Sequence, residues 1–286
     1  MIDSLCTVEK SKGGLEGKSK GIVTLGLFKM QKYLLKPLVK FSKFNFFLPI
    51  ILLNFQSFGH DGDTTKKIES IHAHQELTGH AHAGWESRYF SEGRDALKGE
   101  SLWTGSVEFG YEHFSGGVWY GRSSNHAYDE LQYSFSLTQE KNDWSFYAGY
   151  THLVFSKDDE SDDEWSLGVA YDNLPFSLGS SLDGTYSMDA KGMFYEWSTY
   201  REFSLSEKSE LFVSGLLGLN EGYVSDGHDG ANFYAISIGI DRKITNNFVV
   251  FGHGMQSFAI NPDFTMSGDD QLKDFFHFGL GLQWNF

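Results

Sequence analysis

The feature that most constrains this chain is a two-residue alternation of apolar with small or polar residues, which recurs from Trp85 to Phe286. The chain ends on such a segment, "DFFHFGLGLQWNF", where His, Gly, Gln and Asn separate the apolar positions. Successive side chains of a β-strand point to opposite faces, so this period predicts strands. We expect twelve of them, at 82–91, 101–112, 117–125, 129–139, 143–155, 164–173, 179–188, 192–202, 209–219, 231–242, 246–258 and 275–286.

The second stripe of each strand indicates the fold class. In a water-soluble sandwich or barrel the apolar stripe faces a core, and the other stripe carries charged residues toward solvent. Here the second stripe is mostly Gly, Ser, Thr, Gln and Ala. Such residues suit a crowded or watery lumen, with the apolar stripe turned toward lipid. The sequence therefore predicts an all-β protein, a transmembrane antiparallel up-and-down β-barrel of about 12 strands.

Two further features favour an outer-membrane barrel. The predicted connections alternate between about eight and about four residues, the asymmetry of long loops and short turns that such barrels have. An even strand number places both termini on the short-turn side, the periplasm. The last strand would close the barrel against the first, and its aromatic end at Phe286 resembles the signal that the barrel-assembly machinery reads. The expected partners are this machinery, outer-membrane lipid, and small solutes or ions.

The first 81 residues are organised differently from the rest. Lysines precede an apolar run, 44–55, that is shorter than the roughly 20 residues of a bilayer-spanning helix. With small residues at Ser57 and Gly59, it predicts a signal peptide over 30–59; a buried or anchoring helix is the alternative. We interpret 1–29 as an upstream extension, 60–81 as a His-containing periplasmic lead, and 82–286 as the barrel.

Charge and cysteine content exclude several function classes. Residues 1–59 hold nine of the 23 basic and three of the 38 acidic residues, which leaves 14 basic and 35 acidic groups and a net charge of −21. Such a chain repels nucleic acid. The single cysteine is Cys6, so the predicted mature chain has no disulfide, thiolate metal site or cysteine nucleophile.

The histidine-rich stretch "IHAHQELTGHAHAG" is the candidate metal site of the sequence. Neutral imidazole is a common ligand of zinc, copper and nickel, and the stretch contains two H-x-H units. The predicted ligands are His72, His74, His80 and His82. The alternative is a periplasmic lead that binds nothing.

Charged residues on the predicted inner face are candidates to line a pore. They are Glu86, Arg88, Glu108, Glu112, Arg122, Asp172, Glu196 and Asp241. Six of the eight are acidic, and acidic linings attract cations. The first hypothesis is therefore a passive, cation-preferring channel without a cofactor. The alternative is a non-conducting structural or adhesion barrel, or a barrel that closes its lumen with charge pairs.

An outer-membrane lipid hydrolase is a third hypothesis. It would need a nucleophilic Ser and a His base within hydrogen-bond reach on the lipid side of a strand. The candidates are Ser123 or Ser124 with His126, and Ser257 with His253. The acidic run "SKDDESDDE" lacks the spacing of a known calcium loop and reads as a solvated surface loop.

The stretch "GWESRYFSEGRDALKGESLWTGSVEFGYEHFSGGVWYG" carries a family resemblance. An early strand with Ser87-Arg88-Tyr89, followed by a hairpin ending in Gly117-Val118-Trp119, resembles the opening of TorF-type porins. The resemblance covers about forty residues. It implies a porin-like outer-membrane barrel and transfers no site residues.

Overall fold

A computed structural model of the chain describes residues 77–286. The predicted extension, the signal peptide and most of the histidine-containing lead lie outside the described residues. Within residues 77–286, no helix is long and apolar enough to cross a membrane.

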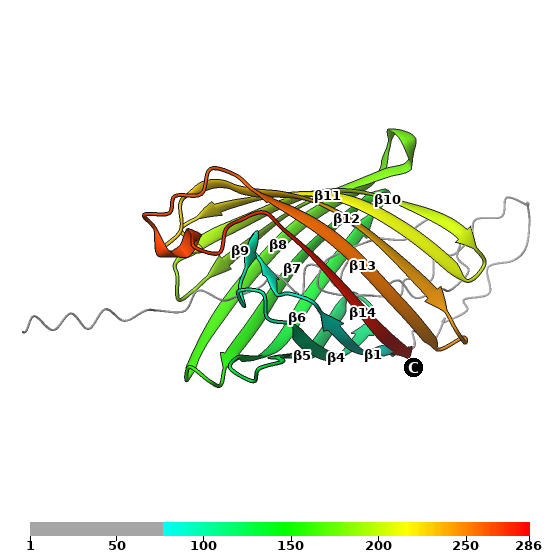
Figure 1. The fold of residues 1–286 in the computed structure, drawn as a ribbon. Coiled ribbons are helices and arrows are strands. Elements are labelled where there is room, and N and C mark those ends of the chain that lie inside the picture. Colours follow the sequence, from blue (N-terminus) through cyan, green and yellow to red (C-terminus); the bar gives the residue numbers. More distant parts are fainter. Residues whose placement is uncertain (1–76) are drawn as a thin grey trace, which may run out of the picture.

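Twelve long antiparallel strands form a closed barrel in which each strand pairs with its neighbours in the chain and the last pairs with the first (Figure 1). This confirms the predicted up-and-down topology. The strands are β1 (Thr78–Glu86), β4 (Leu102–Tyr111), β5 (Phe114–Ser123), β6 (Asp129–Lys141), β7 (Trp144–Phe155), β8 (Glu160–Leu174), β9 (Leu178–Ser187), β10 (Gly192–Ser206), β11 (Ser209–Glu221), β12 (Gly230–Lys243), β13 (Phe248–Ala259) and β14 (Phe275–Asn285). A small hairpin, β2 (Phe90–Ser91) and β3 (Arg94–Asp95), and two 3-10 turns, η1 (Pro175–Ser177) and η2 (Ser267–Asp269), complete the elements.

The two ends of the barrel differ in the length of their connections. At one end the turns have two to four residues, as in 112–113 and 244–247. At the other end the loops reach 15 residues, in 87–101 and 260–274. Figure 1 shows the C-terminus at the end opposite the orange 260–274 loop, hence at the short-turn end. The predicted asymmetry of loops and turns is therefore present.

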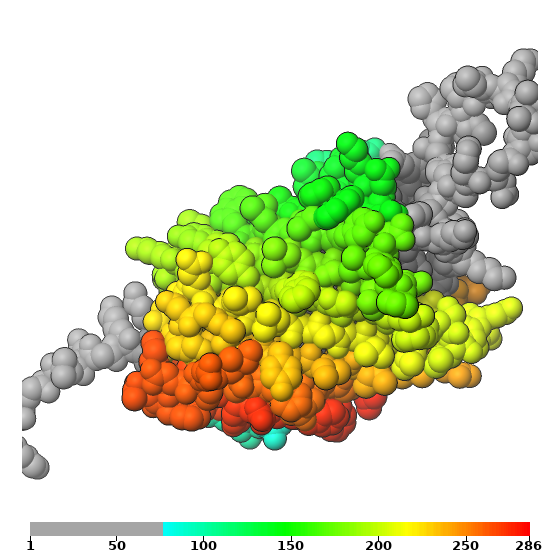
Figure 2. Space-filling view, turned by 90° about the horizontal axis from the view of Figure 1, so that it is seen from above, coloured from blue at the N-terminus to red at the C-terminus, as the bar shows by residue number. Residues whose placement is uncertain are grey.

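The alternation in the sequence corresponds to the two faces of the wall. In β6, Tyr133, Phe135 and Leu137 are exposed on the outside, whereas Ser134 and Ser136 are buried toward the lumen. Figure 2 shows the strands following one another from green to red across a continuous outer wall. Lipid can cover this apolar outer face. The closed barrel also leaves no strand edge with unpaired backbone groups, which a bilayer interior requires.

The barrel closes where β1 meets β14. Gly79 and Phe286 exchange two backbone hydrogen bonds, at 3.0 and 2.9 Å. The pairing continues along both strands to Glu86, which lies opposite Gly279. A side chain at Gly79 would collide with the Phe286 ring, since a Cβ there would lie 2.5 Å from a ring carbon. This position therefore requires glycine if the terminal ring is to lie across the seam.

The first strand differs from the prediction. It spans Thr78–Glu86 instead of 82–91, because the chain leaves the wall after Glu86 and folds the β2–β3 hairpin inward. The hairpin turn at Glu92 and Gly93 has positive φ at both residues, 46° and 83°, as its two-residue length requires. Residues 78–81, assigned to the lead from the sequence, belong to the barrel.

Candidate functional site in the barrel lumen

The inner wall of the barrel carries buried carboxylates. In the twelve barrel strands, no lysine or arginine is buried. The buried acidic side chains of these strands are Glu86, Glu108, Glu130, Glu164, Asp183, Glu196 and Asp241. The charge that the wall presents to the lumen is therefore predominantly negative.

Several of these carboxylates accept hydrogen bonds from other lumen side chains. The Tyr89 hydroxyl donates to Glu130 at 2.7 Å, and Tyr147 donates to Asp183 at 2.8 Å. Tyr223, from the loop after β11, donates to Glu164. These bonds compensate part of the cost of burying a carboxylate, which is high when the group is unpaired. The phenols therefore help to keep acidic residues inside the barrel.

The predicted pore-lining residues fall into two groups. Glu86, Glu108, Asp172, Glu196 and Asp241 lie on the lumen side of their strands, where Asp172 accepts a hydrogen bond from Tyr200.

The other three differ from the prediction. Glu112 is exposed in the turn between β4 and β5, with a φ of 54°, so it lies outside the barrel wall. Arg122 lies on the outer face of β5, the same face as Tyr120. The residues of β5 that face the lumen are Ser123, Gly121 and every second residue before them. Arg88 lies after the end of β1, where it pairs with Asp95 of the hairpin.

The segment that folds inward after β1 forms an aromatic constriction of the lumen, at the end of the barrel with the long loops. Tyr89 and Phe90 are at most 2% exposed. The Phe90 ring lies edge-on to Phe233 of β12, at 5.2 Å between centroids, and stacks on His277 of β14 at 5.9 Å. Gly93 packs against Phe233, since a Cβ there would lie 2.5 Å from that ring. The hairpin thus reaches from the β1 side of the lumen to β12 and β14.

A buried polar network fixes the hairpin to the loop 260–274. Arg94 donates to Asp269 Oδ1 at 2.9 Å, to the Gly268 carbonyl at 2.6 Å and to Asn232 Oδ1 at 3.2 Å. Asp269 also lies 2.5 Å from His228 Nδ1 and accepts the Asp263 backbone N–H at 2.8 Å.

The electrostatics of this network follow from its burial and its partners. Burial lowers the pKa of Arg94, although Glu92 and Asp269 oppose that shift. Burial by itself would raise the pKa of Asp269, but the hydrogen bonds and Arg94 outweigh it and hold this pKa below its ordinary value. The lowered pKa keeps Asp269 ionised near neutral pH beside the Arg94 guanidinium.

A cavity of about 720 Å³ lies between the hairpin and the loops at the long-loop end of the barrel. Its basic lining residues are Arg94 and Lys98. Its acidic lining residues are Glu92, Asp158, Glu160, Asp162, Asp189 and Asp270. Acidic groups outnumber basic ones in this vestibule, as they do on the wall below.

The predicted site of four histidines lies partly outside the described residues, so it stays a prediction. His72 and His74 lie outside the described residues. His80 faces the lumen from β1, with Nε2 3.5 Å from Glu108, and His82 stacks on Phe251 of β13 at 5.1 Å. Both residues face the lumen from β1, and the group of three metal-ligating side chains found within residues 77–286 includes neither of them.

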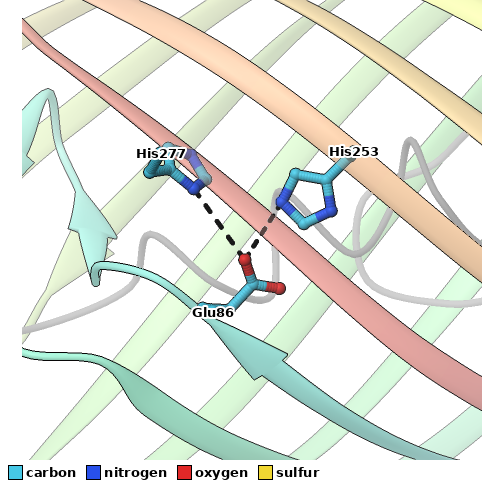
Figure 3. Close-up of side chains that lie close together, drawn as sticks. All are labelled: Glu86, His253 and His277. Carbon is cyan, nitrogen blue, oxygen red and sulfur yellow. Dashed lines mark ion pairs between the residues drawn. The ribbon is translucent and has the colours of Figure 1, made fainter.

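A different histidine pair meets a carboxylate on the lumen wall. Nε2 of His253 lies 3.0 Å from Oε2 of Glu86, and Nδ1 of His277 lies 3.8 Å from the same oxygen. All three side chains are buried. Figure 3 shows both imidazole rings directed toward that carboxylate from the two adjacent strands β13 and β14. One ligand atom from each residue lies within 4.8 Å of the other two.

The hydrolase candidates do not form a nucleophile and base pair. The Ser123 hydroxyl donates to Asn125 at 2.7 Å, and Ser124 contacts Ser101 at 2.5 Å. Ser257 is fully buried on the lumen side of β13, the same side as His253. His253 contacts Glu86 and His277 on the lumen side, away from the lipid-facing surface that a lipid hydrolase would use.

The closed barrel, its apolar outer face and its polar lumen define a porin-like outer-membrane β-barrel. Comparison with solved structures bears on the fold alone, because the sequence identities are low. A KdgM porin superposes with a TM-score of 0.50 at 10% identity, covering 72% of this chain and 99% of the porin. A NanC porin gives a TM-score of 0.47 at 9% identity, with 72% and 98% covered. No protein family and no curated sequence matches the chain. The likeness to the KdgM porin shows the fold.

Part of the lumen site was missed from the sequence although the signal was present. Glu130 and Glu164 flank the outward Leu131 and Trp165, so alternation places them inside. Asp183, whose charge and neighbouring Gly184 weaken the alternation of the predicted strand 179–188, is a buried lumen residue of β9. The contact of Glu86 with His253 and His277 required the register across the seam, which the sequence pattern does not supply.

Proposed function

We propose that this protein is an integral barrel of the bacterial outer membrane that lets small solutes diffuse passively and prefers cations. The observation that carries the preference is the acidic inner wall, on which the twelve barrel strands bury carboxylates but no lysine or arginine. The vestibule has the same sign. Fixed negative charge along a narrow path concentrates cations and repels anions.

The proposed orientation places the long loops outside the cell and both termini in the periplasm. It rests on the pattern of short periplasmic turns and longer outer loops in barrels of this kind. In this orientation a solute first meets the acidic vestibule, then the Tyr89 and Phe90 constriction, and then the lumen wall.

The reversal potential of single channels in a KCl gradient tests the proposal. At low salt we expect cation preference, and at 1 M salt most of it should vanish, because the screening length falls to roughly 3 Å. The combined variant Glu196→Gln and Asp241→Asn should reduce the preference at low salt. Glu112→Gln with Glu207→Gln, at exposed positions of two short turns away from the vestibule, is the matched control and should change it less. Anion preference would contradict the proposal.

A non-conducting structural or adhesion barrel is the second candidate. The packing of Phe90 against Phe233 and Phe275, and of Tyr89 against Tyr128, favours it, since these side chains occupy the lumen. The same recordings separate the two candidates, because a refolded barrel without conductance in any salt would support the second.

A further inference from the structure

The group formed by Glu86, His253 and His277 contains buried polar atoms that lie within ion-pair distance of one another but do not have hydrogen-bond geometry. Among residues 77–286, both ring nitrogens of His253 and of His277, and Oε2 of Glu86, have no hydrogen-bond partner. Their residues are 8%, 1% and 4% exposed, respectively. Unsatisfied buried groups are costly and call for an explanation such as an ion.

We propose that Glu86, His253 and His277 bind a divalent first-row transition-metal ion such as Zn²⁺. Two imidazole nitrogens and one carboxylate oxygen form a donor set that suits zinc, cobalt, nickel or copper, whereas calcium and magnesium prefer oxygen ligands. Donors about 2.1 Å from a tetrahedral ion lie roughly 3.4 Å from one another. The observed separations from the Glu86 oxygen, 3.0 and 3.8 Å, bracket that value.

The backbone around the group leaves room for this arrangement. Gly279 of β14 pairs with Glu86 of β1 on one side and with His253 of β13 on the other. A Cβ at Gly279 would lie 2.2 Å from Glu86 Oε2 and 2.4 Å from His253 Cε1. The two side chains meet over this glycine because it has no side chain of its own. His277, two residues before it on the same face, supplies the third donor.

Three protein ligands leave one position of a tetrahedral ion for water or a solute, as in zinc sites that exchange ligands. The site lies beside the constriction, since Phe90 stacks on His277. A role for the ion as a permeating or blocking cation rests on the proposed function, but its binding does not. Binding is therefore the property to test first.

The test is a zinc titration of the refolded protein in detergent, in competition with a chromogenic chelator. We expect Glu86→Gln, His253→Gln and His277→Gln each to lower zinc affinity by at least about tenfold. Glu196→Gln, which changes another buried lumen carboxylate, should leave the affinity unchanged. The double variant His72→Gln and His74→Gln should also retain this site, which separates it from binding by the histidine-rich lead.

A second variant guards against loss of folding. Gly279→Ala keeps all three ligands but places a methyl group between two of them, so it should weaken zinc binding. Heat-dependent gel mobility verifies that each variant forms a barrel, and Co²⁺ binding adds a visible spectrum that reports tetrahedral coordination. Equal zinc affinity and stoichiometry in the wild type and in folded His253→Gln and His277→Gln variants would overturn the proposal. This titration is independent of conductance, so a non-conducting barrel that binds zinc would reject only the proposed channel function.

Discussion

At the scale of single residues, Asp269 shows how one carboxylate can hold two loops together. It accepts from Arg94, from His228 and from the Asp263 backbone, and its side chain is fully buried. We expect Asp269→Asn to weaken the contact between the hairpin and the loop 260–274 by about 3 kcal/mol, because it leaves the Arg94 charge buried without its partner. Hydrogen exchange of residues 87–100 measures this loss. The exposed Asp270→Asn is the matched control and should exchange like the wild type.

The same residue predicts a pH dependence with a definite sign. The pKa of Asp269 is lower in the folded protein than its ordinary value of 3.8. Its stabilising contribution is therefore present above about pH 4 and is lost as the pH falls through the folded value. Exchange of residues 87–100 should accelerate in the wild type at acid pH, while Asp269→Asn should lack this component. An identical acid response in both proteins would assign it to other groups.

Single residues also show where alternation succeeds and where it fails. Glu108 and Asp241 lie within regularly alternating stretches of their strands, so period-two counting placed them correctly on the lumen side. The prediction placed Arg122 on the wrong face of its strand. Near the end of the predicted strand 117–125, the sequence does not show whether the odd or the even positions face the lumen. The buried Trp119 settles that parity, and a large aromatic residue in the lumen breaks the simple rule that apolar side chains face lipid.

At the scale of elements, the main departure from prediction is the hairpin that follows β1. The sequence around Arg88, Tyr89 and Phe90 continues to resemble a strand, so pattern alone extended the wall to residue 91. The structure turns the chain inward after Glu86, and the tertiary contacts of Phe90 with Phe233 and Phe275 stabilise that path. Local propensity cannot foresee such contacts, because the partners lie more than 140 residues away in the sequence.

The hairpin can be tested with two glycines of similar backbone conformation. Gly93 and Gly99 have φ values of 83° and 95°, so alanine is strained at both. Only Gly93 lies against a ring, whereas the nearest atom to a Cβ at Gly99 is 3.6 Å away. Gly93→Ala should therefore displace the hairpin, raise single-channel conductance and speed proteolysis of residues 87–100 more than Gly99→Ala. Equal effects of the two changes would show that backbone strain, not the Phe233 contact, controls the hairpin.

At the scale of the whole molecule, closure of the barrel brings distant parts of the sequence together. The expectation that the last strand closes against the first is confirmed, and it places β14 between β1 and β13. Glu86 and His253 are 167 positions apart in the sequence, yet both lie opposite Gly279. The fold could be predicted from a repeated local pattern, whereas the histidine and carboxylate group depends on the register of three strands at the seam.

The seam also gives the last prediction. β14 forms backbone ladders with both β1 and β13, so deletion of residues 275–286 would leave two strand edges unpaired. The truncated chain should fail to reach the cell surface, should lose its heat-dependent gel mobility and should be degraded by periplasmic proteases. Phe286→Ala should slow assembly less severely, because it keeps the strand but removes the ring that packs at 6.0 Å from Phe109. Phe264→Ala, an exposed loop position, is the control for losing one aromatic residue. Normal surface levels of the truncated protein would contradict the role of β14 in closing the barrel. They would show that β1 and β13 do not need backbone hydrogen bonds to β14 for the barrel to assemble.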